Sequence, residues 1–157
     1  GGAWGSERDL SIKVMDELGW DMKFHYLRMG PGKGVAFGLL QEVPVFCLPG
    51  GPSSNNMAFL QLALPAILRM AGEQSHPLST AEALLTGDVR GRHIAWTEFK
   101  DAVVTRTTDG GYSVSLYKNS SRLQSIASAN SLICIPEGIE SLKKGELVQV
   151  QFTGPLQ

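Results

Sequence analysis

The sequence predicts a partial α/β domain followed by a small all-β barrel domain. Before residue 55, two loops rich in glycine and proline separate short apolar runs, and the second loop opens a long apolar helix. The polar stretch 72–79 (GEQSHPLS) then interrupts the pattern. After it come short β-type runs separated by turn signals, which is typical of a small barrel or sandwich. We therefore expect two domains, residues 1–78 and 79–157.

The first expected element is a helix over 7–18. Ser6 and Asp9 have the S-x-x-D spacing of a helix start, and Gly19 fits the end of the helix. The apolar residues that repeat every four positions are Leu10, Val14 and Leu18.

A strand over 20–29 comes next, followed by the loop 30–34 (GPGKG). Two short apolar runs, 35–40 and 43–48, are joined by Gln41-Glu42. Their spacing predicts a hairpin or two closely connected strands.

The second rigid loop, 49–56 (PGGPSSNN), opens a helix that we place at 56–71. This helix is apolar on nearly all sides, so it is expected to be buried on more than one side. Pro65 lies inside it and is expected to kink it, because the proline ring removes one backbone hydrogen bond.

The second half predicts strands and one short helical segment at 122–129. Asp109-Gly110-Gly111 has the composition of a hairpin turn. The β-type runs lie at 81–85, 93–106, 112–117, 132–135 and 147–152.

Charge and composition exclude several classes of function. The 14 Lys and Arg residues balance 15 Asp and Glu, for a net charge of −1. This gives no electrostatic reason to expect binding to nucleic acid or to an anionic membrane. No apolar run approaches the ~20 residues of a membrane span. Cys47 and Cys134 lie in apolar runs and are expected to be buried thiols in a reducing compartment, so we expect a cytoplasmic protein.

The two glycine-rich loops are the candidate site. A helix N-terminus offers free N–H groups and a positive dipole end, which suit a phosphate or another oxyanion. Lys33 and Arg28 supply positive charge nearby, and Asp9 could hold a divalent cation or a hydroxyl. The same loops can equally be ordinary turns followed by a helix start. Two interpretations are likewise open for Ser121: it binds a phosphate, or it caps the short helix.

Together these pieces resemble one family. The segments GGAWGSERD and Gly30 to Gly72 are similar to the C-terminal half of molybdopterin molybdenumtransferases, the MoeA proteins, and of the gephyrin E domain. Residues 80–157 resemble the C-terminal β-barrel domain of that family more weakly, with Ser120-Ser121 before a short helix.

The resemblance implies a fold and an activity. The first part would be the C-terminal piece of a molybdopterin-binding domain, a three-layer α/β/α sandwich. Members of the family insert molybdate into adenylylated molybdopterin and release AMP. They use a divalent cation such as Mg²⁺ and form homodimers. The substrates implied here are therefore molybdopterin and molybdate.

The resemblance also implies site residues. Asp9 and Lys33 match residues with catalytic roles, and Asp9 would also bind the metal. The residues implied to bind the cofactor are Arg28, Gly32, Pro49, Gly50, Pro52, Ser54 and Ser121.

Two departures leave a second function open. The resemblance places lysines where this sequence has Tyr26 and Gly30. A member lacking those charges could bind or carry molybdopterin without catalysing transfer. Residue 1 already lies inside the family's α/β domain, so the chain looks like a fragment. We expect either a partner chain or a remodelled sheet.

Overall fold

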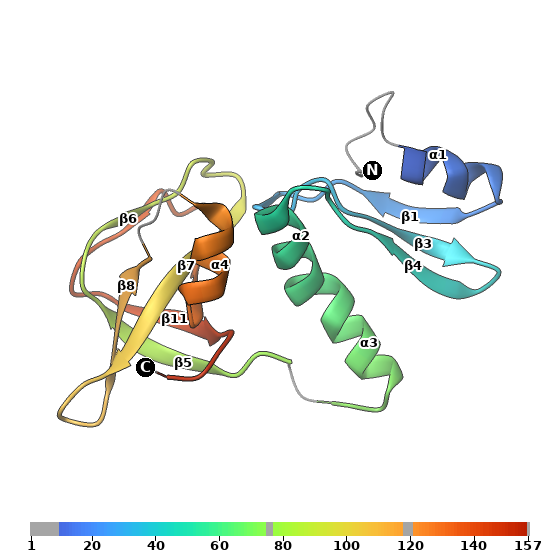
Figure 1. The fold of residues 1–157 in the computed structure, drawn as a ribbon. Coiled ribbons are helices and arrows are strands. Elements are labelled where there is room, and N and C mark those ends of the chain that lie inside the picture. The colour runs from blue at the N-terminus through green and yellow to red at the C-terminus, as the bar shows by residue number, and fades with distance from the viewer. Residues whose placement is uncertain (1–9, 75–76, 118–120, 157) are drawn as a thin grey trace. The chain divides into compact units, whose positions relative to one another are not determined.

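The structure is a computed structural model that describes residues 10–74, 77–117 and 121–156 (Figure 1). The chain divides into two compact units, Gly1–Ser75 and His76–Gln157. Each unit contains its own sheet and its own cluster of buried side chains.

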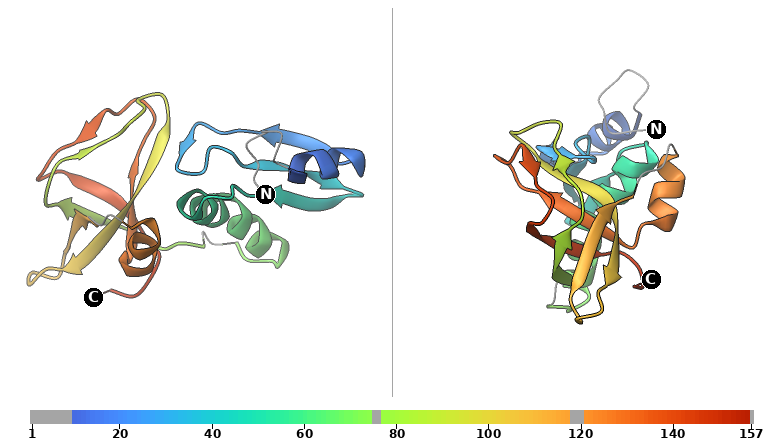
Figure 2. Two further views of the ribbon diagram at one scale, coloured as in Figure 1. Left: turned by 45° about the horizontal axis from the view of Figure 1, so that its top comes forward. Right: turned by 90° about the vertical axis from the view of Figure 1, so that its left-hand side faces the viewer.

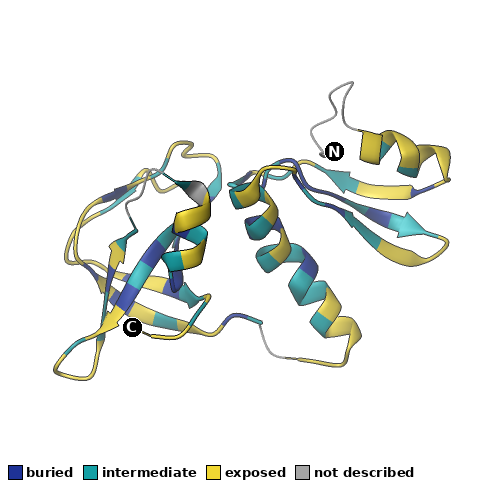
Figure 3. Cartoon of the chain, in the orientation of Figure 1, coloured by how far each residue is buried: buried dark blue, intermediate teal, exposed yellow. Residues whose placement is uncertain are grey.

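The first unit opens with helix α1 (Leu10–Glu17), which confirms the helix predicted there from residue 10 onward. Ser6 and Asp9, the expected helix start, lie outside the described residues. Ile12 and Met15 pack against the buried cluster of the first unit, which is formed by Trp20, Ala36 and Cys47. The four-residue repeat faces solvent: Leu10 is 62%, Val14 47% and Leu18 58% exposed (Figure 3).

Three strands form an antiparallel sheet in the order β1-β3-β4. Their bounds are β1 (Asp21–His25), β3 (Ala36–Leu40) and β4 (Val43–Cys47). The predicted hairpin is confirmed, because β3 pairs with β4 through a two-residue turn. Gln41 and Glu42 form that turn with φ of 49° and 67°, and two positive φ values are what a tight type I′ hairpin turn requires.

The prediction of one strand over 20–29 is wrong. β1 ends at His25, and the next strand residues form the short β2 (Met29–Gly30). Tyr26 has a φ of 68°, which lies outside the β region and ends the strand there.

Gly38 in β3 is required by the tryptophan that covers it. A Cβ on Gly38 would lie 2.5 Å from the indole of Trp20 and 2.5 Å from the carbonyl oxygen of Asp21. Trp20 is 5% exposed. The missing side chain therefore lets the indole lie directly on the strand.

The long helix of the first unit begins at Pro52, four residues before the predicted start. Proline is favoured in the first turn because its φ is already helical and its missing N–H has no partner to lose there. The helix runs without interruption through α2 (Pro52–Ala58), the π-helical turn η1 (Phe59–Ala63) and α3 (Leu64–Met70). The π turn directly precedes Pro65, and in it the Leu64 N–H donates to the Phe59 carbonyl. The kink expected at Pro65 stays a prediction.

The second unit is the predicted small barrel. Its strands run in the order β7-β8-β5-β11-β9, and a further β7–β9 pairing closes the ring (Figure 2). The β5–β8 pair is parallel, and the other four pairs are antiparallel. The elements of this unit are β5 (Thr80–Leu85), β6 (Val89–Arg90), β7 (Thr97–Arg106), β8 (Tyr112–Leu116), α4 (Arg122–Ser128), β9 (Ser131–Ile135), β10 (Ser141–Leu142) and β11 (Leu147–Phe152).

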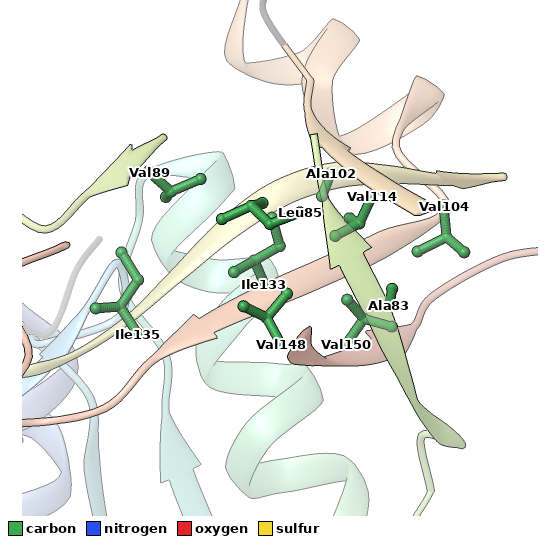
Figure 4. Packing of buried hydrophobic residues seen from close by; sticks show 10 residues of the cluster. All are labelled: Ala83, Leu85, Val89, Ala102, Val104, Val114, Ile133, Ile135, Val148 and Val150. Atoms are coloured by element: carbon green, nitrogen blue, oxygen red, sulfur yellow. The ribbon is translucent and has the colours of Figure 1, made fainter. Parts of the chain in front are cut away.

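Small and branched apolar side chains fill the barrel. Figure 4 shows them converging from the strands. Alternation along each strand places every second side chain inside the ring. The ten core residues are Ala83, Leu85, Val89, Ala102, Val104, Val114, Ile133, Ile135, Val148 and Val150.

The prediction of a strand from residue 93 is wrong at its start. β7 begins at Thr97, and residues 91–96 form a loop. The short pair β6–β10 was not predicted, because two-residue strands leave no alternation to detect.

The two thiols differ in burial. Cys47 is buried, as expected, whereas Cys134 is partly exposed. Burial raises the pKa of both thiols, and the negative charge of Asp16 raises that of Cys47 further. Both are therefore thiols rather than thiolates near neutral pH.

Candidate functional site

The loop 26–34 connects β1 to β3 and carries two of the predicted cations. The Leu27 N–H donates to the Lys33 carbonyl at 3.0 Å, which closes the loop on itself. Lys33 is half-buried and Arg28 is exposed. The backbone of this loop is therefore fixed close to Lys33.

Gly32 allows this loop to lie against helix α2. It has a φ of 116°, and a Cβ there would lie 2.5 Å from the Met29 side chain. The same position is 3.6 Å from the Ser54 carbonyl oxygen and 3.5 Å from the Ala58 nitrogen. Two of the predicted site residues, Gly32 and Ser54, thus lie against each other in the first unit, and Lys33 follows Gly32 in the chain.

The turn that precedes α2 contains the other predicted residues of this unit. Pro49 is fully buried, and its carbonyl accepts a hydrogen bond from Asn55 Nδ2 at 3.0 Å. Gly50 is exposed, and Pro52 opens the helix. Gly51 precedes the helix with extended backbone and provides no side-chain cap. The first turn of α2 therefore relies on groups other than a capping side chain to satisfy its N–H donors.

An aromatic stack lies beside Lys33. The rings of His25 and Tyr26 are nearly parallel, with centroids 3.8 Å apart and an interplanar angle of 15°. Lys33 Nζ lies 5.9 Å from the Tyr26 centroid, within the range of a cation–π interaction. Tyr26, which stands where the resemblance places a lysine, therefore holds a cation rather than supplying one.

The structure does not place two predicted residues relative to this arrangement. Asp9 lies outside the described residues. Ser121 belongs to the second unit, where its side chain caps α4 by accepting from the Gln124 N–H at 3.4 Å. The capping interpretation of Ser121 is therefore correct, and its role toward a ligand stays a prediction.

The second unit contains a buried charged cluster that has no local signal in the sequence. Glu98 is 3% exposed, and its carboxylate accepts from the backbone N–H groups of Arg92 and of His93, the latter at 2.7 Å. Lys100 Nζ donates to it at 2.6 Å. Burial alone would raise the pKa of Glu98, but the Lys100 and backbone hydrogen bonds outweigh it and lower that pKa. Glu98 was missed because it lies inside the stretch predicted as one strand. The alternation of apolar and polar residues there does not indicate which groups a buried carboxylate would bond.

Within the part of the chain that the structure describes, no three His, Cys, Asp or Glu side chains gather in a way that could hold a metal ion. None of the helices seen there is long and apolar enough to cross a membrane.

Comparison with known proteins gives a consistent result. Residues 96–153, which run from the start of β7 to the end of β11, match the family described as the MoeA C-terminal region, domain IV. The chain is 29% identical over 165 residues to molybdopterin molybdenumtransferase 1 of Mycobacterium tuberculosis, covering 97% of this chain and 37% of that protein. It is 30% identical over 153 residues to the molybdopterin molybdenumtransferase of Bacillus subtilis, covering 96% of this chain and 35% of that one.

Solved structures agree with the sequence matches. The molybdopterin biosynthesis MoeA protein of Pyrococcus horikosii superimposes with a TM-score of 0.72 and 30% identity, over 92% of this chain and 34% of that one. The chain thus spans about a third of the length of the curated relatives it matches.

Proposed function

Because the chain belongs to the MoeA family of molybdenum cofactor biosynthesis proteins, and matches the C-terminal part of its members, we propose that it is the C-terminal part of a molybdopterin molybdenumtransferase. The complete enzyme would insert molybdate into adenylylated molybdopterin and release AMP. Residues 1–78 would complete a three-layer molybdopterin-binding domain, and 79–157 would be its barrel domain. A cytoplasmic homodimer is part of the same proposal.

The observation that carries this proposal is the packing of the Lys33 loop on α2. A Cβ added to Gly32 would lie 3.6 Å from the Ser54 carbonyl oxygen, so the loop packs closely on α2 at this glycine. Lys33 follows Gly32 directly in the chain, so we expect its ammonium to lie near the first turns of α2, and a cation beside a helix start suits an oxyanion. The substrates, a molybdopterin phosphate and molybdate, are both oxyanions.

In this mechanism the protein acts by positioning and electrostatics. Lys33 and Arg28 would neutralise the oxygens of molybdate and of the phosphate, and the turn from Pro49 to Ser54 would line the pocket. Charged hydrogen bonds of this kind hold the reactants in place and stabilise charge that develops between them. Ser121, in the barrel domain, is proposed as a further cofactor-binding residue.

The proposed metal site depends on Asp9. One carboxylate fits the way that Mg²⁺ is commonly bound, by one or two carboxylates together with substrate phosphates. Bound there, Mg²⁺ would supply positive charge toward the phosphate oxygens, and Asp9 would hold it in place.

The test of this proposal uses Lys33→Ala and Asp9→Ala in the complete protein, with molybdate-dependent AMP release as the readout. We expect each variant to lose about tenfold or more of the rate, because a charged hydrogen bond contributes roughly 1.5–3 kcal/mol. Lys23→Ala is the matched control, since Lys23 is an exposed lysine on β1 paired with Asp21. Unchanged AMP release in both site variants would refute the proposal.

A second candidate is a non-catalytic member that binds or carries molybdopterin. The observation that favours it is Tyr26, whose ring lies beneath Lys33 and leaves the loop one cation poorer than the resemblance implies. The double variant Tyr26→Lys with Gly30→Lys separates the two. A gain of transfer indicates a degenerate enzyme, and intact binding without transfer indicates a carrier.

A further inference from the structure

A cavity of about 270 Å³ opens in the second unit where β6 passes into the loop 91–96. Nothing in the proposed transfer reaction uses it. Its lining residues are Arg90, Gly91, Arg92, Ile94 and Glu140.

The backbone around this cavity is held at several points. The Gly91 N–H donates to the Glu140 carbonyl at 2.9 Å, and the Gly138 N–H donates to the Ile94 carbonyl at 2.6 Å. The buried carboxylate of Glu98 accepts from the Arg92 N–H on the other side of the loop. The two arginines therefore project from a fixed backbone rather than from a free loop.

The charges at the cavity do not cancel. The Arg90 guanidinium pairs with the Glu140 carboxylate, and both side chains are largely exposed, at 76% and 61%. The Arg92 guanidinium makes no hydrogen bond or ion pair with any residue that the structure describes. Two guanidinium groups thus face one carboxylate at this cavity, although the chain as a whole carries a net charge of −1.

These groups fit one class of ligand. Guanidinium groups bind phosphate in a bidentate manner, and a carboxylate is the usual acceptor for a ribose hydroxyl. The volume lies just below the ~300–1,000 Å³ of typical small-molecule pockets, which suits a small ligand. We propose that this cavity binds a ribose phosphate, with Arg90 and Arg92 on the phosphate and Glu140 accepting from a ribose hydroxyl.

The ribose phosphate can belong to AMP or to a free sugar phosphate, and a titration distinguishes the two. The full chain is titrated by calorimetry with AMP, ribose 5-phosphate, adenosine and inorganic phosphate, in the absence of molybdopterin and molybdate. Saturable binding of AMP and ribose 5-phosphate is expected, with adenosine weaker than either. Tighter binding of AMP than of ribose 5-phosphate identifies a nucleotide site, and equal binding identifies a sugar-phosphate site.

Arg92→Gln is expected to weaken both phosphorylated ligands about tenfold, because it removes the unpaired guanidinium. Arg106→Gln, which removes the same charge from the exposed end of β7, is the matched control and should bind like the unmodified chain. Glu140→Gln should strengthen binding of inorganic phosphate, since it removes the anion that competes for Arg90.

Absence of saturable binding by AMP and ribose 5-phosphate overturns this inference. So does binding that Arg92→Gln leaves unchanged, or that Lys33→Ala abolishes instead. AMP is also the product of the proposed transfer reaction, so the Lys33→Ala and Arg92→Gln variants together separate binding at this cavity from binding at the proposed transfer site, and the two proposals can fail separately.

Discussion

Glu98 carries a negative charge in a place that water scarcely reaches. Its carboxylate is kept charged by Lys100 and by the N–H groups of Arg92 and His93. Removing one partner of a buried pair leaves the other charge uncompensated, and this costs more than the pair itself contributes. Glu98 therefore ties the start of β7 to the loop before it.

Glu98→Gln should lower the free energy of unfolding at neutral pH by about 1–3 kcal/mol. The folded-state pKa of Glu98 is lowered, so its contribution is present above the ordinary Glu pKa of 4.5 and is lost as the pH falls through the folded value. The difference between variant and parent should therefore shrink as the pH falls below 4.5.

Urea denaturation of both proteins at neutral pH and at a series of pH values below 4.5 measures this difference. Glu82→Gln, an exposed carboxylate on β5, should differ from the parent by less than about 0.5 kcal/mol. If the difference in unfolding free energy between Glu98→Gln and the parent stays constant with pH, Glu98 does not carry a stabilising negative charge.

At the scale of elements, the barrel closes where β7 meets β9, and a side chain extends that pairing. Asn130 is 3% exposed; its Oδ1 accepts from the Val104 N–H at 2.8 Å, and its Nδ2 donates to the Val104 carbonyl at 3.0 Å. The amide thus takes the place of one more strand residue beyond the Ala102–Ser131 pair.

Asn130→Ala should destabilise the chain by about 2–4 kcal/mol, because it leaves a buried N–H and a buried carbonyl without partners. Thermal unfolding followed by circular dichroism measures the change. Thr105→Ala serves as the control, since its hydroxyl bonds Ser113 at an exposed position. A shift no larger than that of the control would mean that water satisfies Val104 instead.

Strands and turns were predictable where the pattern is local. The hairpin over 35–48 and the barrel strands follow from alternation and turn residues, and both are confirmed. The end of β1 before Tyr26 was not predictable, because no local sequence pattern indicates a positive φ at a tyrosine. The sequence predicts the two loops of the candidate site. It does not predict how they pack, because Gly32 contacts residues of α2 that lie 22 or more positions further along the chain.

At the scale of the whole molecule, the barrel contains a complete hydrophobic core. All ten core side chains come from one unit, and each of the five ring strands has two neighbours within the ring. A domain of this size with its own core commonly folds alone.

Residues 77–157 expressed alone should therefore unfold in one cooperative transition. Ile133→Ala in the same fragment should lower its stability by about 2–5 kcal/mol, because Ile133 is fully buried. Circular dichroism and amide NMR dispersion are the measurements. A broad, non-cooperative transition in the unmodified fragment would show that the barrel requires the first unit to fold.

The closed ring also determines where unwanted strand association can begin. An unpaired strand edge is a template for fibres and for swapped assemblies, and a ring has none. In the first unit, by contrast, β1 and β4 are the outer strands of the three-stranded sheet. Pro44 on β4 has no N–H to offer an incoming strand, and proline at an edge is a known protection against such addition. Any tendency of this chain to aggregate through its strands should therefore start at β1.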